Sequence, residues 1–126
     1  MELYGYYKML LVTFARELSR RLNPEGVVNT SVFALCPGPV NSNIAREAPA
    51  FFQPLLKMIF SLFFKSPAKA AVPVVYLAAS PDVEGVSFDY LFLMSRQAID
   101  KKAEDAANGR HLWDVSEQLW NDLQMP

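Results

Sequence analysis

The stretch that decides the fold is Tyr4-Gly5-Tyr6-Tyr7-Lys8, which runs without interruption into an apolar-periodic segment that ends near Leu22. Residues four apart lie on one face of a helix, so this stretch predicts a helix that presents Tyr4 and Lys8 side by side. An isolated phenol carries protons poorly at neutral pH, whereas a neighbouring ammonium favours its ionised form. The pair is therefore a candidate for general acid–base chemistry, although a tyrosine on an amphipathic helix more often lies at the rim of a core.

The rest of this helix has an amphipathic pattern. Its apolar side chains recur every three or four residues and predict one buried stripe, formed by Leu11, Phe14, Ala15, Leu18 and Leu22. The charged side chains opposite predict a solvated face, formed by Arg16, Glu17, Arg20 and Arg21. Asn23-Pro24-Glu25-Gly26 then ends the helix, because proline cannot continue it and glycine accepts a left-handed turn.

A continuous apolar run, Val32–Cys36, follows the helix. A run of this length predicts a strand that is buried on both faces of a parallel sheet. Pro37-Gly38-Pro39 places a turn at the carboxyl end of this strand, the edge at which open α/β sheets bind ligands. The pattern fits a ligand-binding loop and also fits an ordinary strand-to-helix turn.

The most apolar stretch, residues 55–64, is too short to cross a bilayer, which takes roughly 20 residues. Three interpretations stay open for it: a helix packed under the sheet, a lid over an apolar substrate, or a surface that enters a membrane interface.

The second half of the sequence predicts a helix, a strand and a further helix. The first helix extends from Ser66-Pro67 to Ala79 with a bend at Pro73. Its predicted buried positions are Ala70, Val74, Leu77 and Ala78. Val86–Leu93 predicts a strand at a sheet edge. Residues 95–110 predict an exposed segment, and residues 112–123 a short amphipathic helix.

In order and spacing, the Tyr-x-x-x-Lys helix, the apolar strand and Pro37-Gly38-Pro39-Val40-Asn41-Ser42 resemble the C-terminal half of a short-chain dehydrogenase/reductase. Residues 76–81 (YLAASP) and 83–87 (VEGVS) resemble the last helix and last strand of the retinol-dehydrogenase-like members. The resemblance implies an α/β fold, the C-terminal portion of a Rossmann-like doubly wound parallel sheet, with about two strands and three or four helices.

The same resemblance implies a single partial Rossmann-type domain over residues 1–126. Residues 1–48 would contain the catalytic helix, the strand and the Pro-Gly loop. Residues 49–66 would form the apolar lid. Residues 67–126 would contain the last helix, the last strand and a C-terminal helix.

The resemblance also implies the site residues. Tyr4 would exchange the proton with the substrate oxygen, and Lys8 would bind the nicotinamide ribose. The cofactor, NAD or NADP, would be lined by Tyr4, Lys8, Pro37, Gly38, Val40 and Ser42. Three positions depart from the residues usual in the family: Ser42 replaces threonine, Tyr7 replaces serine and Phe88 replaces glycine.

These 126 residues do not contain the family's Gly-x-x-x-Gly-x-Gly turn, whose backbone donors hold the dinucleotide pyrophosphate. The family's catalytic serine would also lie before Met1. We therefore expect a truncated NAD(P)-dependent oxidoreductase for a hydrophobic alcohol or carbonyl substrate, inactive as an isolated chain. The alternative is a non-catalytic interaction module that pairs with a full-length relative or a membrane surface.

The composition of the chain bears on its partners, on metal binding and on its location. A net charge of -1 with 20% charged residues offers no basic surface for nucleic acid. The single Cys36 and single His111 predict no metal site. The start of the sequence lacks a secretory pattern, so we expect a cytoplasmic protein with optional membrane contact. A sheet of about two strands is marginal alone, which predicts a homo-oligomer.

Overall fold

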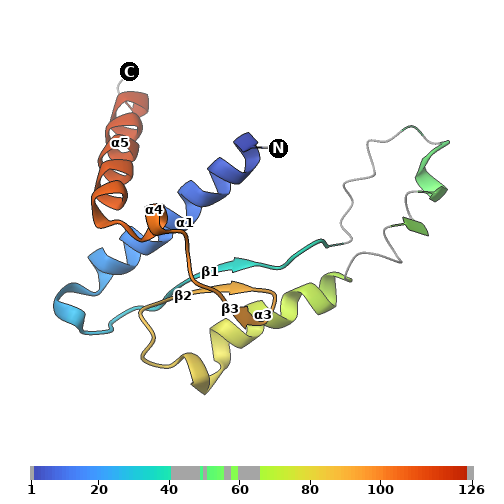
Figure 1. Ribbon diagram of the computed structural model, residues 1–126, viewed down its shortest axis with the longest axis horizontal. Helices are drawn as coiled ribbons and strands as arrows, with labels where there is room; N and C mark the ends of the chain where they lie inside the picture. The colour runs from blue at the N-terminus through green and yellow to red at the C-terminus, as the bar shows by residue number, and fades with distance from the viewer. Residues whose placement is uncertain (1, 41–48, 50, 56–57, 60–65, 125–126) are drawn as a thin grey trace. The chain divides into compact units, whose positions relative to one another are not determined.

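The computed structural model describes residues 2–40, 49, 51–55, 58–59 and 66–124 (Figure 1). Its helices are α1 (Glu2–Leu22), α3 (Pro67–Ala79), α4 (Lys101–Glu104) and α5 (Ala106–Gln124), with short 3₁₀ turns at Pro24–Gly26 and Pro81–Val83. Its strands are β1 (Val32–Cys36), β2 (Phe88–Phe92) and β3 (Ser95–Arg96).

The chain divides into two compact units. The first unit comprises Met1–Ala34, Glu84–Tyr90 and Arg96–Pro126, and therefore contains α1, α4 and α5. The second unit comprises Leu35–Val83 and Leu91–Ser95, and contains α3.

The strands form one sheet in the order β1-β2-β3. Val32 N donates to Ser87 O at 2.9 Å near the start of β1 and β2, and Leu93 N donates to Cys36 O at 2.9 Å near their ends. Start pairs with start and end with end, so these two strands are parallel (Figure 1). This is the α/β arrangement expected of a partial Rossmann-like fold. The strand β1 is half-buried along its length, so the prediction that both faces are fully buried is wrong.

The prediction that the strand near residue 88 lies at a sheet edge is also wrong. The chain turns back after β2, and Gln97 N donates to Tyr90 O at 2.9 Å, which pairs β2 with β3. The strand β2 is therefore central among the described strands. Its side chain Leu91 is fully buried. A two-residue strand such as β3 is too short to give a period-two signal, which explains why the sequence predicted an exposed segment there.

Helix α1 has the predicted end. Glu25 and Gly26 adopt positive φ values of 61° and 76°, which turn the chain out of the helix. The side-chain oxygen of Asn23 accepts from Asn29 N at 2.7 Å and from Thr30 N at 3.0 Å, and its amide nitrogen donates to Thr30 O at 2.8 Å. One asparagine side chain thus fixes the connection that leads into β1.

Helix α1 packs against α4 and α5, beside which it lies in Figure 1. The buried described side chains of α1 are polar: Thr13 is 4% exposed, Glu17 4% and Ser19 1%. The Ser19 hydroxyl donates to Ser87 O at 2.9 Å, which ties the helix to the segment before β2. The predicted solvated face is therefore wrong at Glu17, and the predicted stripe is wrong at Leu11, which is 62% exposed.

Helix α3 begins as predicted, with the Ser66 hydroxyl accepting from Lys69 N at 3.4 Å. Its buried residue is Pro73, whereas Val74 is 53% exposed and Ala78 is exposed. The predicted buried stripe fails because apolar side chains surround this helix on nearly all sides, so the periodicity selects no single face.

Much of the apolar segment 55–64 lies outside the described residues. Within the described part of that segment, Leu55 is 55% exposed and Met58 61%. Among the helices that the structure describes, none combines the length and apolarity that crossing a membrane requires.

Candidate functional site

Helix α1 brings the two principal site residues together. The ammonium Nζ of Lys8 lies 5.4 Å from the centroid of the Tyr4 ring, which is a cation–π contact between residues one turn apart. The contact places positive charge over the ring face. Tyr4 is 69% exposed and Lys8 is exposed, so both groups are accessible to a ligand.

The polar atoms of this pair are not used elsewhere in the described chain. Neither the Tyr4 hydroxyl nor the Lys8 ammonium has a hydrogen bond or an ion pair with another described residue. Lys8 also lines a cavity of about 190 Å³ in the first unit, together with Val12, Tyr90 and Asp100. The pair thus retains its full capacity to donate hydrogen bonds.

The Pro-Gly loop belongs to the second unit. Gly38 has a φ of +72°, and a Cβ at this position would lie 2.7 Å from Leu93 Cδ2. Both the backbone conformation and the close side chain therefore require glycine. Pro37 and Val40 are half-buried, and Ser42 lies outside the described residues.

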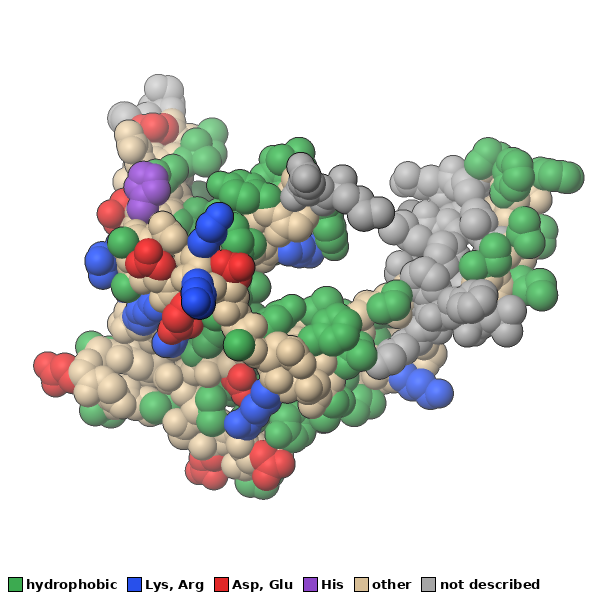
Figure 2. Space-filling model, in the orientation of Figure 1, with side chains coloured by type: hydrophobic (Ala, Val, Ile, Leu, Met, Phe, Trp, Pro, Cys, Tyr) green, Lys and Arg blue, Asp and Glu red, His purple; other side chains and the backbone are tan. Residues whose placement is uncertain are grey.

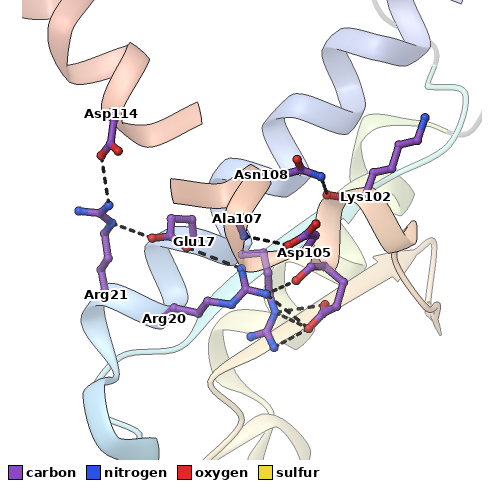
Figure 3. A network of polar contacts seen from close by, with 10 residues as sticks. Glu17, Arg20, Arg21, Lys102, Asp105, Ala107, Asn108 and Asp114 are labelled. Atoms are coloured by element: carbon purple, nitrogen blue, oxygen red, sulfur yellow. Dashed lines mark hydrogen bonds and ion pairs between the residues drawn. The ribbon is translucent and has the colours of Figure 1, made fainter. Parts of the chain in front are cut away.

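Sequence reasoning missed a network of ion pairs around α1 (Figure 3). The buried Glu17 carboxylate accepts from Arg21 Nε at 2.9 Å and lies 3.6 Å from Arg20 Nη1. Arg16 forms a fork with Glu104, with contacts of 3.1, 3.2 and 2.8 Å, and Arg20 donates to the Glu104 carbonyl. The spacing of Glu17 to Arg20 and Arg21, three and four residues, is the signal that predicts such pairing.

An aromatic contact adds to this helix interface. The rings of Phe14 and Trp113 stack with centroids 4.9 Å apart and planes 11° from parallel. The Arg21 guanidinium lies 4.4 Å from the Trp113 ring centroid. The carboxyl-terminal half of α1 is therefore fixed by α4 and α5 through charge and stacking together.

Cys36 and His111, the single cysteine and the single histidine of the sequence, lie on different elements. Cys36 is a half-buried free thiol on β1, and His111 is exposed on α5. Over the residues that the structure describes, no three His, Cys, Asp or Glu side chains are grouped so that they could hold a metal ion.

Comparison with known proteins extends over most of the chain. It is 41% identical over 118 residues to retinol dehydrogenase 14 of Mus musculus, and 38% identical over 120 residues to retinol dehydrogenase 13 of the same species. It is 32% identical over 117 residues to dehydrogenase/reductase SDR family member 13 of Homo sapiens. Each match covers 92% of the chain. The chain belongs to the short-chain dehydrogenase/reductase family.

The chain spans about a third of the length of the curated relatives it matches: 34%, 35% and 30% of the three relatives, respectively. No family model and no solved structure matches it.

The family implies a nicotinamide cofactor, and the described residues of this short-chain dehydrogenase/reductase fit one end of it. The unpaired Lys8 ammonium supplies donors suited to ribose hydroxyls, and it lies on an exposed helix face. The pyrophosphate end has no matching glycine-rich turn in these 126 residues. Among the described residues, the Lys8 ammonium is therefore the group that would hold the ribose of such a cofactor.

Proposed function

We propose that this chain is the substrate-side part of an NAD(P)-dependent oxidoreductase that acts on a hydrophobic alcohol or the corresponding carbonyl compound. The observation that carries the proposal is its 41% identity over 118 residues to a retinol dehydrogenase. The exposed, adjacent Tyr4 and Lys8 on α1 add the functional groups that such a reaction needs. Because the relatives are named for retinol, retinol is the first substrate to test.

Tyr4 carries the proton in this proposal. In the oxidation direction its ionised Oη takes the proton from the substrate hydroxyl, and in reduction its hydroxyl returns a proton to the carbonyl oxygen. The Lys8 ammonium lies over the same ring, 5.4 Å from its centroid. Lys8 also donates to the ribose hydroxyls and so orients the nicotinamide. The bound cofactor supplies the hydride acceptor or donor.

An apolar substrate suits the side chains near the predicted lid. Phe51 is 85% exposed, Phe52 51% and Met58 61%, and all three belong to the second unit. Covering such exposed aromatic and thioether side chains with an apolar molecule removes them from water, which lowers the free energy of the complex. We propose that residues 49–66 cover the hydrocarbon part of the substrate.

A chimera tests this proposal. The aligned residues of this chain replace the matching 118-residue segment of mouse retinol dehydrogenase 14. We expect the chimera to oxidise retinol with NAD or NADP, followed by the nicotinamide absorbance. A chimera that is folded and binds NADH or NADPH, yet turns over neither retinol nor other hydrophobic alcohols, would contradict the proposal. In parallel, nicotinamide fluorescence during titration of the 126-residue chain measures cofactor binding by this chain itself.

A second candidate function is an interaction module. Figure 2 shows hydrophobic side chains at the surface over the amino-terminal turns of α1 and along α3. Leu3, Tyr7 and Leu11 are 65%, 57% and 62% exposed. Exposed apolar patches of this kind mark contact surfaces. This second candidate pairs with another copy, with a full-length relative, or with a membrane surface.

Light scattering and vesicle flotation separate the two candidates. The interaction module predicts self-association at micromolar concentration or co-flotation with phospholipid vesicles. A monodisperse monomer that does not bind vesicles contradicts the second candidate. That result does not bear on the oxidoreductase proposal, which the chimera tests.

A further inference from the structure

The first unit contains a second cavity, of about 410 Å³, formed by α1, α4 and α5. Its volume falls in the range of roughly 300–1,000 Å³ that is typical of small-ligand sites. The walls are largely apolar, with Met9 and Leu10 from α1 and Leu112 and Val115 from α5. Such walls favour a hydrocarbon group.

Polar groups complete the lining. Tyr6, Lys102 and His111 all border the cavity, and the side-chain polar atoms of these three residues have no hydrogen bond or ion pair within the described chain. The backbone of Lys102 is engaged: its N–H donates to Asp100 Oδ1 at 2.8 Å and its carbonyl accepts from Asn108 Nδ2 at 2.9 Å. In Figure 3 the Lys102 ammonium lies outside the dashed contacts.

The charge of the cavity has one sign. None of its described lining residues is acidic, whereas Lys102 supplies a positive charge and His111 a further hydrogen-bond donor. A carboxylate held by an ammonium and a ring N–H makes charge-assisted hydrogen bonds, which are stronger than neutral ones. The combination of apolar walls with basic polar groups therefore matches a ligand that has an anionic head and an apolar tail.

This cavity is separate from the Tyr4–Lys8 pair. At 100° per residue, the lining positions 6, 9, 10 and 13 lie roughly half a turn around α1 from positions 4 and 8. A ligand in the cavity would therefore contact the side of the helix opposite to the candidate catalytic residues.

We propose that the cavity binds an amphipathic carboxylate of the fatty-acid class. The apolar tail lies between α1 and α5, and the carboxylate accepts hydrogen bonds from Lys102 and His111. This inference does not depend on the oxidoreductase proposal, because it uses neither Tyr4 nor Lys8.

Titration of the purified chain with sodium dodecanoate, followed by calorimetry, tests the inference. We expect saturable one-to-one binding in the micromolar range, with dodecanol at least tenfold weaker because it lacks the carboxylate. Lys102→Gln should weaken binding about tenfold, whereas Lys101→Gln should leave it unchanged. Lys101 is the matched control, since it is the exposed neighbour on α4 and does not line the cavity. His111→Gln provides an independent test of the donor role.

Steric blocking gives a second readout. Val115→Trp fills the cavity and should abolish dodecanoate binding, whereas Leu119→Trp, on an exposed position outside the lining, should not. Circular dichroism establishes that each variant is folded. The inference is overturned by absence of binding, by equal affinity for dodecanol, or by equal effects at Lys101 and Lys102. The inference is also overturned if Val115→Trp leaves dodecanoate binding intact. If the same variant abolishes self-association in ultracentrifugation, the cavity is a contact with a second copy of the chain.

Discussion

The two halves of α1 differ in what surrounds them. The carboxyl-terminal half is held by buried Glu17 and Ser19, by the stacked Phe14 and by ion pairs to α4 and α5. The amino-terminal half exposes its tyrosines, including Tyr4 at 69%. One helix therefore combines an anchored end with an accessible end that carries the candidate catalytic groups. The residues that hold the helix in place and the candidate catalytic residues lie in different halves. Substitutions in the carboxyl-terminal half should therefore lower stability, and substitutions in the amino-terminal half should change activity.

The largest expected effect belongs to the exposed half. Tyr4→Phe in the chimera should lower turnover by roughly 10²–10⁴-fold, because it removes the proton carrier. The melting temperature should stay the same, since the Tyr4 side chain is exposed. Steady-state kinetics and thermal melting measure the two effects. Tyr7→Phe is the matched control, because Tyr7 is also exposed and the oxidoreductase proposal gives its hydroxyl no role. Similar losses at both positions would remove the distinction between them.

The next effect belongs to the anchored half. Glu17→Gln should lower the free energy of unfolding by about 2–3 kcal/mol, because it removes a buried charge that pairs with two arginines. Urea unfolding measures the change. Glu104→Gln is the control: its side chain is 49% exposed, so its loss should cost less than about 1 kcal/mol. Equal costs would show that burial of Glu17 adds nothing.

Two glycines extend the comparison: Gly5 lies in the exposed half of α1, and Gly109 lies on α5 where that helix approaches the anchored half at Glu17. A Cβ at Gly109 would lie 2.9 Å from Glu17 Oε2 and 3.2 Å from Glu17 Cβ, so Gly109→Ala should destabilise by about 1 kcal/mol despite the higher helix propensity of alanine. Gly5 has nothing within 4 Å of such a Cβ, so Gly5→Ala should stabilise by about 0.5–1 kcal/mol. Opposite signs in urea unfolding support the comparison, and a gain at Gly109 would refute close packing there.

The smallest effect on stability is expected at the surface of the exposed half. Leu3→Ser should change the free energy of unfolding by no more than about 0.5 kcal/mol, because Leu3 is 65% exposed. If the interaction module is correct, the same substitution should reduce the apparent mass in light scattering. A large loss of stability would mean that this half is packed after all.

The local sequence predicted the elements of the fold well. The helix over α1, its end at Pro24 and Gly26, the strand at Val32–Cys36 and the Ser66 cap were all read from short-range patterns, and the structure confirms them. These features depend on nearby residues, through periodicity, capping and the φ preferences of proline and glycine. The contact of Tyr4 with Lys8 follows likewise from helical spacing.

The short-range patterns did not predict which distant residues contact each element. The sequence placed Glu17 on a solvated face, because a charged side chain is usually exposed, yet α5 approaches closely at Gly109 and covers it. The central place of β2 depends on the short β3, whose two residues carry no periodic signal. The roles of Tyr4, Lys8 and the Pro37–Ser42 loop remain predictions that the chimera can test.

The sequence by itself determined where this chain forms helices and strands, which glycines must turn and which tyrosine stands beside a lysine, because those properties arise from interactions within a few residues. Only the tertiary structure decided that a carboxylate on α1 is buried, that β2 has a neighbour on each side, and that an apolar cavity with basic groups opens between helices. These depend on contacts between residues distant in sequence, whose free energy is set by packing rather than by local propensity.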